Sequence, residues 1–223
     1  MKILIIIVEG QTEKEFVQKT LRNYFHSLGI YDVRAIMIQT SKGHKGGLVN
    51  YDHLKNDIDR ILKSEKAVIV STFVDFFRIP SNFPGYGLSL SKTNVDLKIE
   101  VLEEGMRRDI NDDRFVPYIQ KHEFEALLFS SDRGFSNWFD DIGIIADLTT
   151  IVNKYSNPEE INTGIDTAPS KRIIKILGSK NKKYDKIAEG NLIAEEIGIQ
   201  RILEKCPNFK KWIELLIIKL KEN

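Results

Sequence analysis

The sequence is poor in cysteine and has almost no net charge. Its 223 residues include a single cysteine, Cys206, which excludes an internal disulfide and a zinc site built from several cysteines. This composition suits a reducing compartment, and we expect a cytoplasmic protein. The 33 basic and 32 acidic residues give a formal net charge of +1. The overall charge therefore does not indicate a nucleic-acid-binding protein, although a local basic patch remains open.

The sequence also lacks an apolar stretch that would predict a membrane span near its beginning. The first apolar run ends at Val8, well short of the roughly 20 residues that a transmembrane helix needs. Lys2 is the only basic residue ahead of this run, and no small-residue cleavage site follows it, so we predict neither a signal peptide nor a contact with a membrane. With 42% hydrophobic residues, the chain is long enough to bury one good core.

Strand-like and helix-like patterns alternate in the first part of the chain. Apolar runs rich in β-branched residues predict buried strands, and apolar residues at helical spacing predict the helices between them. The predicted strands are 3–8, 33–39, 67–74 and 115–120, and the predicted helices are 13–28, 51–62 and 94–110, with a helical segment after 120. This order predicts an α/β fold with a parallel sheet of about four strands flanked by helices.

The pattern changes after residue 130. Only helical segments are predicted there, at 142–155, 169–177, 184–197 and from 199 to the C-terminus. We therefore expect an α/β domain over residues 1–130 and an α-helical extension packed on it over residues 131–223.

Acidic residues follow two of the predicted strands directly. Glu9 comes after the first strand and Asp75 after the third, while Glu13 falls in the first turn of the next helix. Ligands bind beyond the carboxyl ends of the strands in such sheets. Carboxylates that meet there repel one another unless a cation lies between them, which predicts a site for a hard divalent metal ion. The alternative is that Glu13 or Thr12 only caps the helix and that Asp75 is structural.

Two further acids, Glu123 and Glu125, follow the fourth predicted strand. Residues two apart on a helix do not share a face, so only one of them is expected to point toward a metal, and we favour Glu125. The alternative is that both are ordinary acids in the first turn of a helix.

Two basic segments are candidates for binding phosphate. The stretch SKGHKGG carries Lys42, His44 and Lys45 among glycines, so its backbone amides and cations can approach a phosphate closely. It does not match a nucleotide-binding glycine motif and is otherwise a solvated loop. Lys171 and Arg172, at the start of a predicted helix, are the second candidate.

The motif VEGQTE, together with TFVD at the end of the third strand, resembles the Toprim fold of topoisomerases, primases and overcoming-lysogenization-defect (OLD) nucleases. The resemblance implies that Glu9, Glu13 and Asp75 bind Mg²⁺ or Mn²⁺ and that Glu9 and Asp75 are catalytic. It departs from those families at Phe77, where the second aspartate of a D-x-D pair is expected. Glu125 is a candidate replacement for that ligand.

A longer pattern covers nearly the whole chain. The segments VEGQTE, FVDFF, FPGYG, HEFEALLF, APSKR and CPNFKKW together resemble an uncharacterised prokaryotic Toprim-like family, the domain of unknown function numbered forty-two seventy-six. That family is often encoded beside ATPases in defence loci, which implies a possible ATPase partner.

The residues and the resemblance together predict a Mg²⁺- or Mn²⁺-dependent nuclease that acts on DNA or RNA. A second interpretation is a noncatalytic Toprim-like subunit that binds nucleic acid or an ATPase partner, which the near-neutral charge and Phe77 favour. A third is a phosphatase or phosphotransferase that acts on a small molecule.

Overall fold

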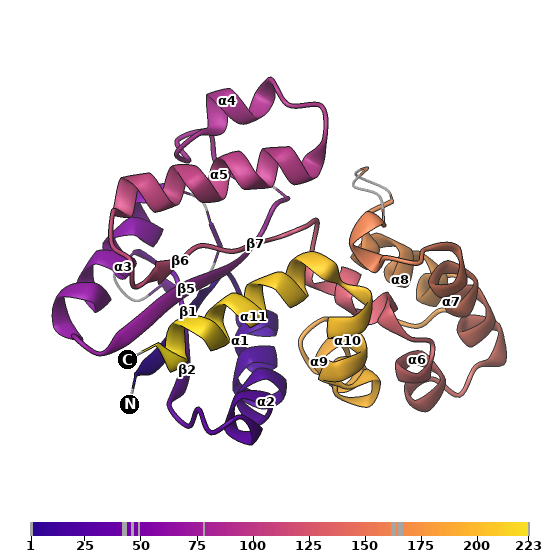
Figure 1. Ribbon diagram of the computed structural model, residues 1–223. Coiled ribbons are helices and arrows are strands. Elements are labelled where there is room, and N and C mark those ends of the chain that lie inside the picture. The colour runs from indigo at the N-terminus through magenta and orange to yellow at the C-terminus, as the bar shows by residue number, and fades with distance from the viewer. Residues whose placement is uncertain are drawn as a thin grey trace. The chain divides into compact units, whose positions relative to one another are not determined.

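A parallel sheet covered by helices forms the first of two units in the computed structural model (Figure 1). The structure describes residues 2–41, 44–45, 47–48, 50–77, 79–161, 164 and 167–222. The first unit contains Met1–Lys121 and Trp212–Asn223, and the second contains His122–Lys211. The predicted α/β class is confirmed.

The five strands of this sheet run parallel. They are β1 (Ile3–Val8), β2 (Val33–Met37), β5 (Val68–Asp75), β6 (Phe115–Val116) and β7 (Ile119–Gln120). β1 lies in the middle and pairs with β2 on one side and with β5 on the other, while β6 and β7 both pair with β5. The apolar run of β1 is explained by this position, because a central strand of a covered parallel sheet is buried on both faces.

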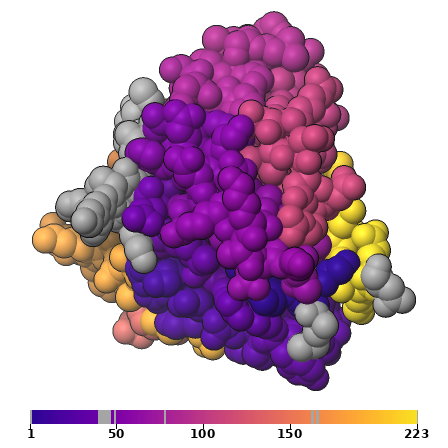
Figure 2. All heavy atoms as spheres, turned by 90° about the vertical axis from the view of Figure 1, so that its left-hand side faces the viewer, coloured from indigo at the N-terminus to yellow at the C-terminus, as the bar shows by residue number. Residues whose placement is uncertain are grey.

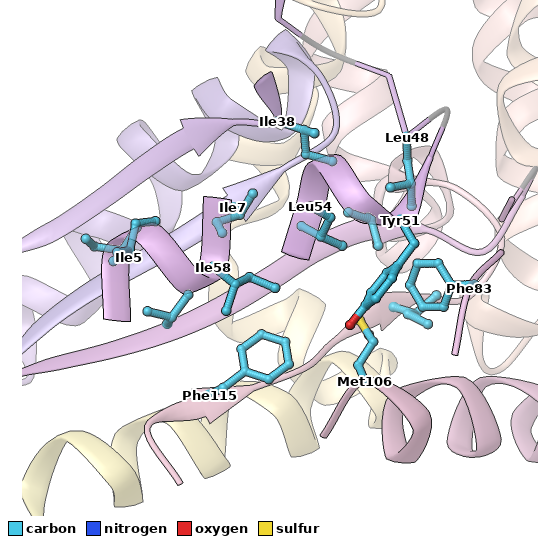
Figure 3. Close-up of a cluster of buried hydrophobic side chains, with 14 of the residues drawn as sticks. Ile5, Ile7, Ile38, Leu48, Tyr51, Leu54, Ile58, Phe83, Met106 and Phe115 are labelled. Atoms are coloured by element: carbon cyan, nitrogen blue, oxygen red, sulfur yellow. The ribbon is translucent and has the colours of Figure 1, made fainter. Parts of the chain in front are cut away.

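One face of the sheet is covered by α3 (Tyr51–Ser64) and α5 (Val95–Ile110). Ile5 and Ile7 of β1 lie in the same buried cluster as Leu54 of α3 (Figure 3). Asparagine side chains cap both helices, since Asn50 and Asn94 each accept a hydrogen bond from the backbone two residues on, which satisfies an amide at the helix start.

An aromatic pair and a polar link join α3 to its neighbours. The ring of Tyr51 lies edge-on to Phe83, with 4.9 Å between centroids (Figure 3). Its hydroxyl donates to Asp109 on α5, which also binds Lys55 at 2.7 Å. From the outside of the unit, α3 (purple) meets the surface of α4 and α5 (magenta to pink) without a break (Figure 2).

The other face is covered by a continuous helical stretch, α1 (Gln11–Phe16), a π-helical turn (Val17–Leu21) and α2 (Arg22–Ser27), and by the end of α11 (Pro207–Lys221). The Phe73 ring contacts Phe16 at 6.1 Å and Trp212 at 5.4 Å between centroids. Strand residues thus alternate between two helical layers.

The predicted fourth strand, 115–120, is divided in two. Pro117 separates β6 from β7 and has no N–H to donate. Side chains of β5 complete the hydrogen bonding instead. Thr72 Oγ1 donates to the carbonyl of Tyr118 at 2.8 Å and accepts from its amide at 2.9 Å, while Ser71 donates to Val116 at 2.6 Å.

The predicted second strand, 33–39, is shorter than expected. β2 ends at Met37, and Gln39–Ser41 forms a separate strand, β3, that pairs antiparallel with β4 (His44–Lys45). Buried Asp57 accepts a hydrogen bond from the amide of Gln39 at 2.9 Å, which fixes this change of direction.

The regular secondary structure in the described residues of the second unit is helical. After the 3₁₀ helix Phe124–Ser130, its α-helices are α6 (Arg133–Trp138), α7 (Ile142–Lys154), α8 (Pro169–Gly178), α9 (Ala188–Ile197) and α10 (Ile199–Lys205), with a 3₁₀ turn at Pro158–Glu160 and the start of α11. All seven residues of Phe124–Ser130 are buried.

The first of the two units is made of two separate stretches of the chain. Its first stretch ends at Lys121 and its second begins at Trp212, because Trp212 packs among the aromatic rings of the sheet face. The division into domains 1–130 and 131–223 stays a prediction.

None of the helices in the described part of the chain is both long and apolar enough to span a membrane.

Two helical glycines provide a matched test of packing in the first unit. A β-carbon on Gly105 of α5 would lie 2.6 Å from the carbonyl carbon of Pro84, whereas one on Gly87 of α4 (Tyr86–Leu90) would meet no atom within 4 Å. We expect Gly105→Ala to lower the free energy of unfolding by about 2 kcal/mol or more, because backbone must move. Gly87→Ala should be neutral or stabilise by up to about 1 kcal/mol. Urea unfolding of both variants measures the difference, and equal stabilities would contradict this packing.

Candidate functional site

Glu9 connects three segments of the chain at the carboxyl edge of the sheet. Its backbone oxygen accepts a hydrogen bond from Gly47 at 2.9 Å. Its side-chain Oε1 lies 3.4 Å from the amide nitrogen of Leu48, and Oε2 lies 3.4 Å from that of Asp75. Because β1 and β5 are hydrogen-bonded neighbours, Glu9 and Asp75 leave the sheet side by side.

Two contacts between the Glu9 carboxylate and backbone amides are long. Typical N–H···O distances are about 2.7–3.2 Å, so contacts of 3.4 Å orient the carboxylate toward the amide dipoles without binding it tightly. Each carboxylate oxygen has two lone pairs, and the geometry therefore allows Glu9 to contact a cation while it faces these amides.

Glu13 lies in the first turn of α1 and is only 8% exposed. Its Oε2 atom is 2.9 Å from the position that a β-carbon on Gly10 would occupy. Gly10 has an extended backbone, with φ of −140°, that any residue can adopt. The glycine after Glu9 therefore provides space for the Glu13 carboxylate.

Asp75 pairs across the sheet with Gln120, a residue that the sequence did not single out. Gln120 is fully buried, accepts a hydrogen bond from the Tyr118 hydroxyl at 2.7 Å and donates to the carbonyl of Lys121 at 3.1 Å. Lys121 is 2% exposed and binds Asp96 at 2.8 Å. The signal for these residues in the sequence was the run of polar residues, beginning at Gln120, that directly follows an apolar stretch.

The fit of these residues to a metal is partial. Within the described ranges, no three Asp, Glu, His or Cys side chains form a group that could hold a metal ion. Mg²⁺ does not require three protein ligands, because it commonly binds through one or two carboxylates, water and substrate phosphates. Glu9 and Asp75 provide two carboxylates on one edge, with Glu13 beside Gly10. The metal role of these residues stays a prediction.

Glu125 lies in the second unit, so the structure does not place it relative to Glu9. Its side chain is 3% exposed and forms an ion pair with Lys186 at 2.9 Å. Burial raises the pKa of the Glu125 carboxyl above its usual 4.5, and the charge of Glu123 raises it further, whereas Lys186 lowers it. The hydroxyl of Tyr184 is buried nearby, and burial together with the Glu125 charge raises the pKa of that phenol.

Glu123 binds a backbone amide at the start of a helix in the same unit. Its Oε2 accepts a hydrogen bond from the amide of Ser170 at 3.0 Å, at the start of α8. Pro169 occupies the first helical position, where its missing N–H costs nothing, and Glu123 satisfies the next amide.

The predicted phosphate-binding residues lie in both units. Lys42 falls outside the described residues, and His44 and Lys45 form β4 in the first unit. Lys171 is exposed on α8, while Arg172 donates to the carbonyl of Thr167 at 2.8 Å and lies over the ring of Tyr155. Their role in binding phosphate stays a prediction.

The raised pKa of Glu125 predicts the sign of a pH effect. The folded carboxyl holds its proton to higher pH than the unfolded one, so its contribution to stability is present below about pH 4.5 and is lost as pH rises through the folded pKa. We expect the free energy of unfolding of Glu125→Gln to fall less than that of the parent protein as the pH is raised from about 5 to about 8. Urea unfolding at both pH values tests this, with Glu195→Gln as an exposed control. A larger loss in Glu125→Gln would show that the ion pair outweighs burial.

Comparison with known proteins gives one family and one structure. Residues 8–217 match the model of a domain of unknown function, DUF4276. A search of curated proteins finds no match. Among solved structures, the C-terminal region of the OLD protein of Xanthomonas campestris pv. campestris is similar with a TM-score of 0.46 and 12% identity, over 96% of this chain and 95% of that one. The family match spans nearly the whole sequence, and the chain therefore belongs to the DUF4276 family.

Proposed function

We propose that the protein is a divalent-metal-dependent nuclease of Toprim type that hydrolyses phosphodiester bonds. The observation that carries the proposal is the approach of the Glu9 carboxylate to Asp75 at the shared edge of two neighbouring parallel strands, 3.4 Å from the Asp75 amide. The Toprim-like motif around Glu9 supports it.

In this proposal Glu9 and Asp75 hold Mg²⁺ or Mn²⁺, with Glu13 beside them. A metal bound there would activate water and neutralise charge on the scissile phosphate. The chain's own contribution is orientation. The amides of Leu48 and Asp75 aim the Glu9 carboxylate, and Gly10 leaves room for Glu13. Glu125 is the candidate additional ligand.

The resemblance also supports a biological setting. We infer nucleic acid as the substrate, an ATPase as a possible partner and prokaryotic defence as the context, in the cytoplasm. Lys42, His44 and Lys45 would contact the substrate backbone near the first unit, and Lys171 and Arg172 would do so from the second. Lysine and arginine contacts to phosphates position a nucleic acid without reading its sequence.

A noncatalytic role is the second candidate. Phe77 stands where a D-x-D pair would place its second aspartate, and the described residues provide no group of three metal ligands. Glu9 then acts as a structural tie between β1, β5 and the segment at Leu48. Binding without cleavage distinguishes this role.

Removal of either central carboxylate tests the nuclease directly. We expect the purified protein to cleave labelled DNA or RNA in the presence of Mg²⁺ or Mn²⁺. Glu9→Gln and Asp75→Asn should each lower the rate by about 100-fold or more, since a lost ligand removes several kcal/mol of transition-state stabilisation.

Glu104→Gln is the matched control, because Glu104 makes only surface ion pairs with Arg107 and Arg108 in the described structure. It should cleave at the parental rate. Cleavage that survives in both Glu9→Gln and Asp75→Asn would contradict the assignment of the site.

The melting temperature reports metal binding even where no cleavage occurs. A ligand that binds only the folded state raises stability by about 2.7 kcal/mol at 100 times its dissociation constant. We expect Mn²⁺ to raise the melting temperature of the parent protein and of Gly87→Ala. In Gly10→Ala, the new methyl group displaces the Glu13 carboxylate, so the shift should be smaller. An equal shift in both variants would exclude Glu13 from the metal site.

A further inference from the structure

Positive charge is concentrated in one segment of a chain that is nearly neutral overall. Residues 167–186 contain seven lysines and arginines but one acid, Asp185, while the whole protein has a formal net charge of +1. This concentration is a local basic patch of the kind that the overall charge conceals.

The fold exposes this charge along α8 and the turn that follows (orange in Figure 1). Lys171 and Lys175 are exposed, whereas Ile173 and Leu177 on the other side of α8 are buried. Lys182 and Lys183 continue the exposed surface beyond the end of the helix. We call Lys171, Lys175, Lys182 and Lys183 the lysine face.

Most of the charge of the lysine face is not neutralised within the unit, the exception being Lys182, which interacts with Asp141. Throughout the described part of the chain, these four lysines form no ion pair. The neighbouring cations are engaged, since Lys186 binds Glu125. Asp141 interacts with Lys182 and with Lys180, and both lysines lower the pKa of its carboxyl after the larger effect of its own backbone hydrogen bonds.

The start of α8 does not serve as an anion site, because Glu123 occupies it. The Ser170 amide donates to the Glu123 carboxylate, so a phosphate at that end would meet a negative charge. The lysines on the outer side of the helix are the remaining basic groups.

We propose that the lysine face binds the sugar–phosphate backbone of a nucleic acid, independently of sequence. α8 alone is about 15 Å long at 1.5 Å per residue, which spans about four steps of a duplex at 3.4 Å per step. Lys171 and Lys175 lie four residues apart on the exposed side of α8, and two separate ammonium groups on one side of a helix match a ligand that repeats its charge along a line. The choice of ligand rests on the proposed nuclease function.

An anionic membrane fits this surface less well. A helix that lies in a membrane interface inserts a broad apolar side, but the apolar side of α8 is already buried against the second unit at Ile173 and Leu177. Beside the lysines of α8, the large apolar side chain of Ile174 is exposed, with 41% of its surface accessible.

The test is the binding of labelled oligonucleotides of about 20 nucleotides, single- and double-stranded, in EDTA so that no metal-dependent cleavage occurs, between about 50 and 200 mM NaCl. The variant is Lys171→Glu with Lys183→Glu. A glutamate at position 171 suits the first turn of α8, so this variant should fold. Lys63→Glu with Lys66→Glu, two exposed lysines of the first unit, is the control with the same change of charge.

We expect the lysine-face variant to bind at least about tenfold more weakly, and the slope of log K against log[salt] to become shallower by about 1.4 for single strands and about 1.8 for duplexes. The control should keep the parental slope. Parental affinity and slope in the lysine-face variant, no binding by the parent protein, or tighter binding of phosphatidylserine vesicles than of oligonucleotides would each overturn the proposal. Lysine-dependent binding by a protein that cleaves nothing would uphold the lysine face while the nuclease proposal fails.

Discussion

The parallel pairing of β1 with β5 is the constraint on which the candidate site depends. It brings Val8 opposite Phe73. Glu9 follows Val8 directly and Asp75 lies two residues beyond Phe73, so both acids leave the sheet at the same edge. The burial of both strands between two helical layers fixes this register, because a slip by one residue would turn each strand's apolar side chains to the opposite layer. The approach of Glu9 to Asp75 is therefore a consequence of core packing.

Buried or partly buried carboxylates that accept hydrogen bonds from backbone amides recur through the molecule, and Glu9 differs from the others in its distances. Glu159, which is fully buried, accepts from Asn208 at 2.8 Å and from Phe209 at 3.0 Å at the start of α11, and Glu123 accepts at 3.0 Å at the start of α8. These short bonds satisfy helix amides that have no partner in their own helix. Glu9 also faces two amides, but at 3.4 Å from each, and it does so at a strand edge. The looser contacts are compatible with a carboxylate that also binds a cation.

The sequence predicted the elements whose signal is local and periodic. The strands at 3–8 and 67–74 and the helix at 51–62 are present within one or two residues, because continuous apolar runs and amphipathic spacing reflect burial directly. The interruption of the strand at 115–120 depends on hydroxyl groups of another strand, and the burial of Gln120 depends on a hydrogen bond from Tyr118. Contacts of this kind have no periodic signature.

The candidate site was predictable to the same extent. That acids at the ends of neighbouring strands come together follows from topology, whereas the space that Gly10 provides for Glu13 required coordinates. The most direct measurement is a crystal structure of the protein soaked in Mn²⁺, with anomalous diffraction used to locate the metal. We expect a manganese peak within bonding distance of carboxylate oxygens of Glu9 and Asp75. A well-ordered edge without such a peak at saturating Mn²⁺ would contradict the metal site and leave Glu9 as a structural tie.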